Sequence, residues 1–380
     1  MTDGSGPLRV LVVNAGSSSL KLRLVGPRDE LLASADPPPV GGDAAQLTRI
    51  VAELGAIDAV GHRIVHGGVD FVGPVRIDAS VVDRLQALTD LAPLHQPAAL
   101  AALKAVSAAL PSTPAVACFD TAFHATIPPG AATYALPAEW RDRWPIRRFG
   151  FHGLSHAYAA RRAARLLGRS LEEVRLVTCH LGAGASLAAV SGGLSVDTTM
   201  GFTPLDGLMM ATRSGSVDPG LVLWLLERSH LSPSQLGEAL ERKSGLLGLA
   251  GTSDMREVLA AEEREARDPD RKNQSGAASL AVAVYLHRLG AGIASMAAAM
   301  GGLDGLVFTG GVGENAPSIR ARAAEGLTFL GIRLDPEANL GGGDRLIGAA
   351  DAPVPALVIE AREDLEIAHQ VRQLLERERD

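Results

Sequence analysis

The chain has 380 residues, a length that predicts about two domains, each large enough to bury its own core. Hydrophobic residues make up 47% and charged residues 21% of it, as in ordinary soluble globular proteins. The net charge of -7 argues against nucleic acid or an anionic membrane surface as a partner.

The sequence also argues against export and membrane insertion. The first residues, MTDGSGPLRV, carry an aspartate and no apolar core, so we expect no secretory signal. His287, Arg288 and several glycines interrupt the Ala-rich stretch 277–300, so we expect no membrane span there. Cys118 and Cys179 end apolar runs, which favours buried free thiols in a reducing cytoplasm over a disulfide.

The N-terminal part of the chain predicts a β-hairpin followed by helices and strands. LRVLVVN (8–14) and SLKLRLV (19–25) have strand character, and the second run alternates apolar residues with Lys21 and Arg23. The further elements expected before residue 170 are a helix over 43–54, a strand over 57–65, a helix from Pro97 to Leu110, a strand over 114–119 and a helix from its N-cap Ser155 to Gly168.

The C-terminal part continues this mixed α/β order. Its expected elements are a strand over 174–179, a hairpin through 185–197, helices near 219–228, 233–242 and 276–300, a strand over 305–309 with a helix after it, a strand over 354–360 and a C-terminal helix.

Two short segments of the chain resemble each other. NAG (14–16) and then SL (19–20) follow one apolar strand, while HLG (180–182) and then SL (186–187) follow another, with one residue more. A strand, a polar loop and a second strand in each half indicate a duplicated fold with a nucleotide between the halves. Chance similarity over so few residues is the alternative.

The stretch 180–219 is rich in Gly, Ser and Thr and poor in charge. Small residues let backbone N–H groups approach an anion, and hydroxyls add further donors. Because Arg213 stands in the middle of TRSGS, the stretch has the composition of a phosphate or carboxylate site. A polar surface loop is the alternative, but loops of this length are usually functional or disordered, and this one is too apolar for disorder.

Several common kinds of site are excluded by their motifs. No G-x-x-x-x-G-K-S/T is present, and neither HLGAGAS nor TGGVGEN completes G-x-G-x-x-G. No G-x-S-x-G hydrolase elbow follows a strand. His62 and His66, like His152 and His156, have the i, i+4 spacing of zinc ligands on a helix, but HRIVHGG predicts a strand and a turn, and no further ligand completes a set.

The remaining polar residues favour phosphoryl transfer, which needs cations, hydrogen-bond donors and a metal held by oxygens around the moving group. Asn14 and two acids that end predicted strands, Asp120 and Glu363, supply oxygens. The candidate donors are Arg63, Arg213, His152 and His180. Any one of these residues could instead form a purely structural ion pair. The presence of the whole set is what favours a phosphoryl-transfer site.

The chain resembles the acetate kinase (acetokinase) family, within the acetate and sugar kinase/heat-shock/actin superfamily. The motifs that carry the resemblance follow one another over almost the whole chain: NAGSSSLK (14–21), GHRIVHGG (61–68), APLHQP (92–97), FDTAFH (119–124), FGFHGLSH (149–156), HLGAGAS (180–186), MGFTPLDGLMMATRSGSVDP (200–219), SGLLGLAG (244–251), FTGGVGEN (308–315) and AREDLEIA (361–368).

The resemblance implies an α/β fold of two duplicated ribonuclease H-like (actin-like ATPase) domains with a nucleotide cleft between them. Residues 1–124 with 363–380 would form one domain and 125–362 the other. The implied protein is a cytoplasmic homodimer that reversibly transfers a phosphoryl group from ATP to acetate, giving ADP and acetyl phosphate. Mg²⁺ would be its cofactor, with Mn²⁺ as a substitute.

The resemblance also implies roles for individual residues. Asn14 and Glu363 would hold magnesium, and Arg63 would bind the acetate carboxylate. The implied catalytic residues are Asp120, as acid, base or orienting group, and His152 and Arg213, on the moving phosphoryl group. The implied pocket for the acetate methyl consists of Val65, Leu94, Phe151 and Pro204. The implied ATP-binding residues are Lys21, His180, Leu181, Gly182, Ala183, Gly184, Asp254, Met255, Arg256, Gly311, Val312, Gly313, Glu314 and Asn315.

The chain departs from the usual family pattern in a few places. Ala183 and Gln96 each stand where the pattern has asparagine, and Ala211 and Ser216 replace the first Gly and the Asp of MGTRSGD. SGLLGLAGTSDMR (244–256) is one residue short. No proposed catalytic residue is lost, so these departures concern the adenosine contacts more than the chemistry.

Other functions remain open from the sequence. A short-chain acyl kinase that prefers propionate or butyrate would differ in pocket volume, and one methylene is worth only ~1–3 kcal/mol. An actin-like regulatory ATPase would not need Arg63 and Arg213 to face a small carboxylate. An inactive homologue is disfavoured because every proposed chemical residue is present. An enzyme that uses only pyrophosphate is disfavoured because Gly311 leaves space for adenosine.

Overall fold

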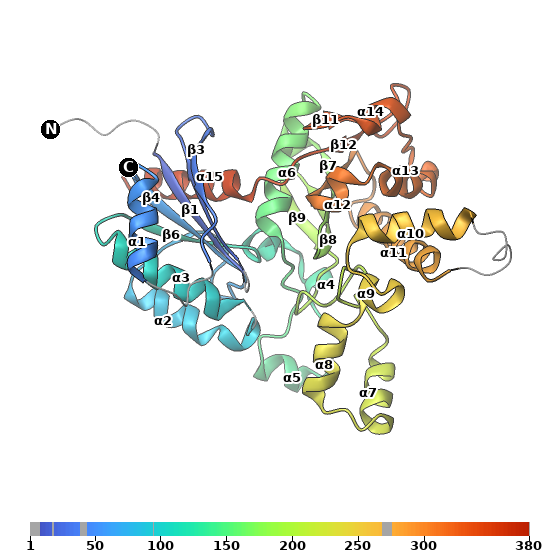
Figure 1. The fold of residues 1–380 in the computed structure, drawn as a ribbon, viewed down its shortest axis with the longest axis horizontal. Coiled ribbons are helices and arrows are strands. Elements are labelled where there is room, and N and C mark those ends of the chain that lie inside the picture. The colour runs from blue at the N-terminus through green and yellow to red at the C-terminus, as the bar shows by residue number, and fades with distance from the viewer. Residues whose placement is uncertain (1–7, 17–18, 39–43, 94, 268–275, 380) are drawn as a thin grey trace. The chain divides into compact units, whose positions relative to one another are not determined.

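The computed structural model describes residues 8–16, 19–38, 44–93, 95–267 and 276–379 (Figure 1). The chain forms two compact units. The first unit consists of Met1–Ala125, Phe151–Tyr158 and Arg362–Asp380, and the second of Thr126–Gly150 and Ala159–Ala361. These units differ from the expected domain boundaries at residues 151–158, which lie with the first unit.

The first unit is built on a six-stranded sheet of order β3-β2-β1-β4-β6-β5. Its strands are β1 (Val10–Ala15), β2 (Leu20–Val25), β3 (Leu31–Ala35), β4 (Ala59–Ile64), β5 (Val75–Arg76) and β6 (Ala115–Phe119). β1 pairs antiparallel with β2, which confirms the predicted hairpin, and parallel with β4, which is itself parallel to β6. The carboxyl ends of β1, β4 and β6 therefore lie at the same end of the sheet.

Helices cover both faces of this sheet. They are α1 (Ala44–Glu53), α2 (Ala79–Ala87), α3 (Gln96–Ala109) and α15 (Glu363–Arg377). Because side chains alternate along a strand, Val13 of β1 packs with Val106 of α3, whereas Val12 packs with Ile367 of α15. β4 lies so close to α15 that a Cβ atom at Gly61 would overlap Ile367, so this position requires glycine.

The second unit is built on another six-stranded sheet, of order β11-β12-β10-β7-β8-β9. Its strands are β7 (Arg175–Leu181), β8 (Ala185–Ser191), β9 (Leu194–Thr198), β10 (Gly305–Thr309), β11 (Arg345–Leu346) and β12 (Ala356–Val358). β7, β8 and β9 are antiparallel, and β7, β10 and β12 are parallel. The order β12-β10-β7-β8-β9 repeats the order β6-β4-β1-β2-β3, so the predicted duplication is confirmed.

The remaining helices connect these strands. They are α4 (Pro129–Ala132), α5 (Ala138–Arg143), α6 (Gly153–Leu166), α7 (Pro219–Arg228), α8 (Pro233–Arg242), α9 (Gly245–Ala250), α10 (Met255–Arg267), α11 (Ala277–Ala299), α12 (Gly310–Asn315), α13 (Pro317–Glu325) and α14 (Pro336–Leu340). Short 3₁₀ turns span Thr89–Leu91, Ala122–Thr126, Leu171–Glu173 and Thr328–Leu330.

Helix α11 is the core helix of the second unit. It contacts β7, β8 and β9 as well as α9, α10 and α13. By length and composition alone it could cross a membrane, but its buried residues, among them Tyr285, Leu289 and Ile293, pack inside the unit. Its apolar character is therefore that of a core helix.

Three details of the sequence prediction were wrong. Ser155 is not the N-cap of α6, because the helix starts at Gly153, whose N–H donates to the Asp120 carbonyl at 2.9 Å. Glu363 begins α15 instead of ending a strand, and the strand expected over 354–360 contracts to Ala356–Val358. The prediction of free, buried thiols at Cys118 and Cys179 is confirmed.

Candidate active site

Four predicted site residues come together in the first unit, at the carboxyl end of its parallel strands. Asn14 lies near the end of β1, Arg63 near the end of β4, and Asp120 directly after β6. Glu363, the first residue of α15, completes the cluster. Residues 349 positions apart meet directly, since Asn14 Nδ2 donates to Glu363 Oε2 at 3.4 Å.

Arg63 is fixed by its neighbours in this cluster. Its Nη2 and Nε donate to Asp120 Oδ2 at 2.6 and 3.2 Å, and its Nη1 donates to Asn14 Oδ1 at 3.1 Å. Glu363 Oε2 lies 3.9 Å from Arg63 Nε. The Asp120 side chain is 1% exposed and that of Arg63 19%, so the pair is largely removed from water and its geometry is rigid.

Burial and the neighbouring charges in the cluster shift the pKa values of Arg63 and Asp120. Burial lowers the pKa of Arg63, but the negative charges of Asp120 and Glu363 outweigh it and raise the pKa overall. Burial raises the pKa of Asp120; the positive charge of Arg63 acts against this shift, and the negative charge of Glu363 adds to it. Asp120 therefore depends on Arg63 to stay ionised.

Asn14 and Glu363 fit a magnesium ion. Mg²⁺ prefers oxygen ligands, often binds few protein groups and keeps several waters. The Asn14 amide now donates to Glu363 through its nitrogen and accepts from Arg63 Nη1 through its oxygen. A half turn of this amide would place its oxygen beside the carboxylate, at the cost of the hydrogen bond to Arg63. Among the described residues there is no group of three or more His, Cys, Asp and Glu side chains that could hold a metal ion, so a site here would have few protein ligands.

His152 lies beside this cluster in an unusual backbone conformation. Its φ of 57° is left-handed, which costs a residue with a Cβ roughly 1–3 kcal/mol and is often retained at functional sites. The next residue, Gly153, lies so close to the Asp120 carbonyl that a Cβ would overlap it. The close contact of Gly153 with Asp120, the residue after β6, therefore positions the neighbouring backbone of His152.

The residues of the predicted acetate pocket belong to both units of the chain. Val65 is half-buried after β4, and Phe151 is 2% exposed, with its ring edge-on to His66 at 5.5 Å between centroids. Pro204 belongs to the second unit, and Leu94 lies outside the described residues. The composition of the acetate pocket stays a prediction.

The second unit contains a cavity of about 540 Å³ between its strand ends and helices, a volume within the range of about 300–1,000 Å³ of small-molecule sites. Eight of the predicted ATP-binding residues line it: Gly182, Ala183, Asp254, Met255, Arg256, Gly311, Val312 and Asn315. Six further lining residues were not predicted: Ala211, Leu246, Ser253, Leu259, Tyr285 and Ala316. Ser253 and Ala316 adjoin predicted residues, and Ala211 and Leu246 lie within the quoted family motifs. Leu259 and Tyr285 come from α10 and α11, and no quoted motif marks them.

Two glycine-containing loops form one wall of this cavity. One joins β7 to β8 through Gly182, and the other is the start of α12 after β10. They approach so closely that a Cβ at Gly310 would lie 2.9 Å from the Leu181 carbonyl oxygen, and Gly310 has φ 78°. A Cβ at Gly311 would meet no atom within 4 Å, so this glycine leaves open space in the cavity.

The charged residues of this cavity are Asp254 and Arg256, and they pair with each other. Arg256 Nε donates to Asp254 Oδ1 at 3.0 Å. This hydrogen bonding lowers the pKa of Asp254 to about 2. Because the Arg256 side chain is 90% exposed, the guanidinium can leave this pair without a large cost.

The other predicted ATP-binding residues do not line the cavity: Lys21, His180, Leu181, Gly184, Gly313 and Glu314. Lys21 belongs to the first unit, where it pairs with Asn14 across the hairpin. Glu314 has a structural contact, since its Oε1 accepts from the Gly310 and Ala361 N–H groups, each at 2.9 Å. His180 lies close to the cavity wall, 3.6 Å from the position of a Cβ at Gly182.

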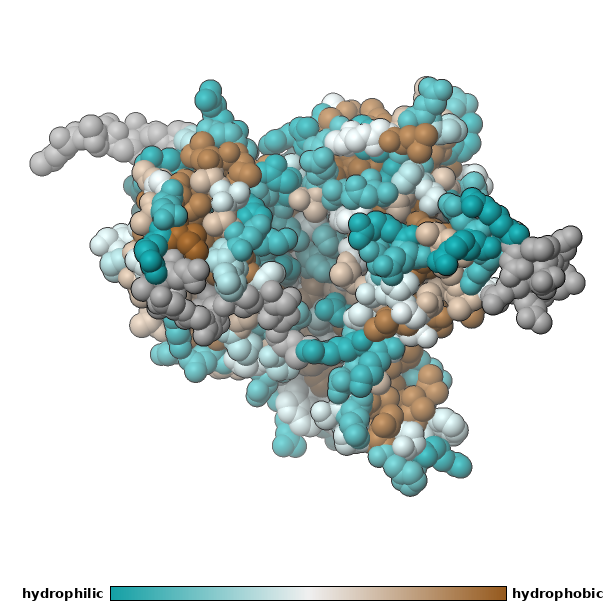
Figure 2. Space-filling model, in the orientation of Figure 1, coloured by the Kyte–Doolittle hydropathy of each residue, from teal (hydrophilic) through white to brown (hydrophobic). Residues whose placement is uncertain are grey.

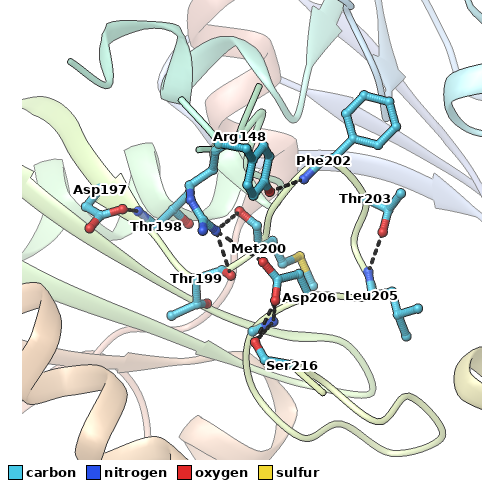
Figure 3. Close-up of polar contacts among 12 residues, drawn as sticks. Arg148, Asp197, Thr198, Thr199, Met200, Phe202, Thr203, Leu205, Asp206 and Ser216 are labelled. Carbon is cyan, nitrogen blue, oxygen red and sulfur yellow. Dashed lines mark hydrogen bonds and ion pairs between the residues drawn. The ribbon is translucent and has the colours of Figure 1, made fainter. Parts of the chain in front are cut away.

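Arg213 lies in the loop between β9 and α7, which is held by polar contacts within the second unit (Figure 3). Arg148 Nη1 donates to the carbonyls of Thr199 and Met200, both at 3.1 Å, and approaches Asp206 Oδ2 at 3.4 Å. Ser216, a departure from the family pattern, donates to Asp206 Oδ1 at 2.5 Å and so closes the loop.

Arg213 itself makes few strong contacts in this loop. Its Nη1 donates to the Pro204 carbonyl at 3.3 Å and lies 3.7 Å from Met210 Sδ. Burial lowers the pKa of Arg213, with the charge of Glu241 acting in the opposite direction. A guanidinium remains charged in a protein, so this is a poorly solvated cation that an anionic ligand would stabilise.

Comparison with known proteins identifies the family. The model of the acetokinase family matches residues 43–369. The acetate kinase of Gloeobacter violaceus is 44% identical, with 97% of this chain and 100% of the relative covered, and that of Deinococcus deserti is 47% identical, with 96% and 97% covered.

Solved structures give the same result. The acetate kinase of Porphyromonas gingivalis is 35% identical, with a TM-score of 0.88 over 97% of this chain and all of that one. A propionate kinase from Francisella tularensis is 34% identical, with a TM-score of 0.87 over 96% of this chain and 99% of that one. The chain, with its repeated sheets and its Asn14–Arg63–Asp120–Glu363 cluster, belongs to the acetokinase family.

Proposed function

We propose that this chain is an enzyme that transfers the γ-phosphoryl group of ATP to acetate, giving acetyl phosphate and ADP, and that it catalyses the reverse reaction as well. Its relatives named acetate kinase are matched over nearly their whole length. The observation that carries the proposal for this chain is the cluster in the first unit, where Arg63 is rigidly oriented by Asp120 and Asn14. A fixed guanidinium suits a small carboxylate.

In the proposed reaction a carboxylate oxygen of acetate bonds to the γ-phosphorus as the bond to the β,γ-bridging oxygen breaks, and ADP departs with the electron pair. Acetate is already ionised at neutral pH, so the step needs no base to remove a proton. We therefore assign Asp120 an orienting role: its carboxylate accepts from Nε and Nη2 of Arg63 and fixes the guanidinium plane.

Charge on the moving phosphoryl group would be stabilised by Arg213 and His152. Burial makes the Arg213 cation poorly solvated, so its attraction for phosphoryl oxygens is less screened than at the surface. Mg²⁺ bound by Asn14 and Glu363, or Mn²⁺ in its place, would neutralise phosphate charge. The cavity of the second unit, with Gly182 and Gly311 in its wall, is the proposed site for the nucleotide.

The test is trapping of the acyl phosphate with hydroxylamine, with ATP as donor and acetate, propionate and butyrate compared as acceptors. The expected result is Mg²⁺-dependent hydroxamate formation, with the highest kcat/KM for acetate. Absence of hydroxamate with all three acids, from a folded protein that binds ATP, would contradict the proposed activity.

A propionate-preferring acyl kinase is the second candidate. The similarity to the Francisella propionate kinase, nearly as high as that to the Porphyromonas acetate kinase, supports it. The two candidates differ by one methylene in the substrate, so the acetate-to-propionate ratio in the same trapping assay separates them.

We also propose that the enzyme is a cytoplasmic homodimer that associates through α7 and binds neither nucleic acid nor membrane. Helix α7 exposes Leu221, Leu223 and Trp224 by 46%, 62% and 53%, and Figure 2 shows apolar side chains gathered over this helix. Exposed apolar patches of this kind mark association surfaces, and a second copy would bring the same patch to a two-fold interface.

Light scattering after size-exclusion chromatography tests the dimer. Trp224→Glu should convert a dimer to a monomer, because a carboxylate would be buried at the interface without a partner. Phe329→Glu is the matched control, since Phe329 is 72% exposed elsewhere in the second unit. A dimer unaffected by Trp224→Glu would exclude α7 as the interface.

A further inference from the structure

The first unit contains a second cavity, of about 510 Å³, which we call the α3 cavity. It lies between α3 and the starts of β4 and β6, where Val60, Pro114 and Ala115 line it. Arg63 and Asp120 stand at the opposite, carboxyl ends of these strands. The α3 cavity is therefore separate from the cluster described above.

One face of β4 carries Arg63 of the cluster, and the opposite face carries His62 of the α3 cavity. Side chains alternate along the strand, so neighbouring residues point to opposite faces of the sheet. Arg63 contacts Glu363 of α15 on one face. His62 lines the α3 cavity together with Leu103 of α3 on the other.

His62 carries an unsatisfied hydrogen-bonding group. The residue is 1% exposed, and its Nε2 has no hydrogen-bond partner among the described residues. Burial lowers the pKa of His62 to about 4, so the ring is neutral at pH 7. An unpartnered polar atom in the interior is costly and rare. Because the His62 residue lines the α3 cavity, a ligand in this cavity is the group that could satisfy Nε2.

The rim of the α3 cavity has a cation that is available to a ligand. Lys104 of α3 is exposed and forms no ion pair among the described residues. The other charged groups have partners, since Arg76 Nη1 lies 3.1 Å from Glu378 Oε2 and Asp78 Oδ1 accepts from the Val81 N–H at 2.8 Å. Apolar side chains, among them Leu103, form the rest of the wall beside hydroxyls such as that of Ser107.

We propose that the α3 cavity binds a small organic acid, with the carboxylate between Lys104 and His62 and an apolar body against the wall formed by α3. Lys104 supplies the charge and neutral His62 donates a hydrogen bond from Nε2. The chemistry is that of a short-chain carboxylate longer than the proposed substrate, because the volume exceeds what acetate fills. The proposal does not depend on the proposed activity, since its test measures binding.

Calorimetric titration of the full-length protein at pH 7 with sodium hexanoate tests the proposal. We expect one site with a Kd of about 0.1–10 mM, as the few atoms of such a ligand allow. Hexylamine, with the same chain and the opposite charge, should not bind. Ser107→Trp, which fills the cavity, and Lys104→Ala, which removes the cation, should each weaken hexanoate at least about tenfold.

Lys243→Ala is the matched control, because Lys243 is an exposed lysine of the second unit, and it should leave hexanoate binding unchanged. The ¹⁵N resonance of His62 Nε2, assigned by comparison with His62→Gln, should shift on titration with hexanoate. This readout does not rely on the fold of the Ser107→Trp variant. Absence of binding, binding that Lys104→Ala leaves unchanged, or an unperturbed His62 resonance would each overturn the proposal.

Discussion

Arg63 shows how a site residue depends on its neighbours. Its guanidinium hydrogen-bonds Asp120 through Nε and Nη2 and Asn14 through Nη1, so three strands determine the position of one side chain. Because Asp120 is almost completely buried, removing one partner would leave the other as an uncompensated interior charge. The carboxylate of Asp120 is thus needed for the geometry of the site even though acetate requires no base.

Replacement of Arg213 by alanine should mainly reduce kcat. The residue is a poorly solvated cation on a loop fixed by Arg148 and Asp206, and a preorganised donor of this kind is worth roughly 10²–10⁴ in rate. Steady-state kinetics with a check of ATP binding would measure this. Arg288→Ala, at an exposed arginine of α11, serves as the control. An Arg213→Ala enzyme within threefold of the wild type would exclude the proposed role.

Val65→Ala should change the preference between acyl chains. Val65 follows β4 directly after Arg63 and Ile64, so its side chain is placed to limit the length of an acid bound at Arg63. Propionate should gain relative to acetate by about one buried methylene, ~0.8 kcal/mol. The ratio of kcat/KM values reports this, with Val69→Ala, at a residue 50% exposed, as control. Wild-type turnover of butyrate as fast as acetate would show that the pocket is assigned wrongly.

Several helices and strand ends together, more than any single residue, form the proposed nucleotide cavity of the second unit. The hairpin loop after β7 and the start of α12 form one wall of this cavity, and α9, α10 and α11 add Leu246, Leu259 and Tyr285. Side-chain groups that could distinguish bases are few, because Asp254 and Arg256 pair with each other and Asn315 Nδ2 donates to the Gly311 carbonyl at 2.9 Å. We therefore expect a nucleotide in this cavity to be held more by its phosphates and ribose than by its base edge.

Nucleotide selectivity should therefore be relaxed. We expect ATP to be the best donor, with GTP and ITP within about tenfold, or ~1.4 kcal/mol. Ala183→Asn adds an amide to the cavity wall and should lower KM for the nucleotide while leaving KM for acetate unchanged. Values of kcat/KM for ATP, GTP, ITP and pyrophosphate would measure this, and a hundredfold preference for ATP over GTP in the wild type would refute it.

At the scale of the whole molecule, the first unit should be the acid-sensitive part. Burial lowers the pKa values of His62, His66 and His124, all in this unit, from 6.5 to about 4. Between pH 6.5 and 4 the unfolded chain binds these protons and the folded chain does not. The free energy of unfolding therefore falls as the pH is lowered through this window, by up to ~1.4 kcal/mol per pH unit for each histidine.

Calorimetry between pH 7.5 and 4.5 would measure this loss. All three tryptophans, Trp140, Trp144 and Trp224, lie in the second unit, so their fluorescence follows that unit separately. His62→Leu should reduce the pH slope by about one proton. His230→Asn, at an exposed histidine, is the control. A Tm of the first unit that stays constant over this pH range would contradict the prediction.

The sequence by itself determined the family and most of the elements, and it marked the residues that form the candidate site. Periodicity was sufficient for β1, β2 and β4 and for α7 and α8, because each has a clear apolar pattern and a distinct start or end. Long family motifs marked Asn14, Arg63 and Asp120, because the site requires those residue types at the ends of strands.

Only the tertiary structure decided how these residues meet. Glu363 lies far from Asn14 in sequence, and it reaches the cluster because α15 packs on β1 and β4 over Gly61. The start of α6 follows from the contact of Gly153 with the Asp120 carbonyl, which outweighs the capping preference of Ser155. Tyr285 reaches the cavity proposed for the nucleotide, and His62 reaches the α3 cavity, through packing between elements distant in sequence. No local sequence pattern records such packing.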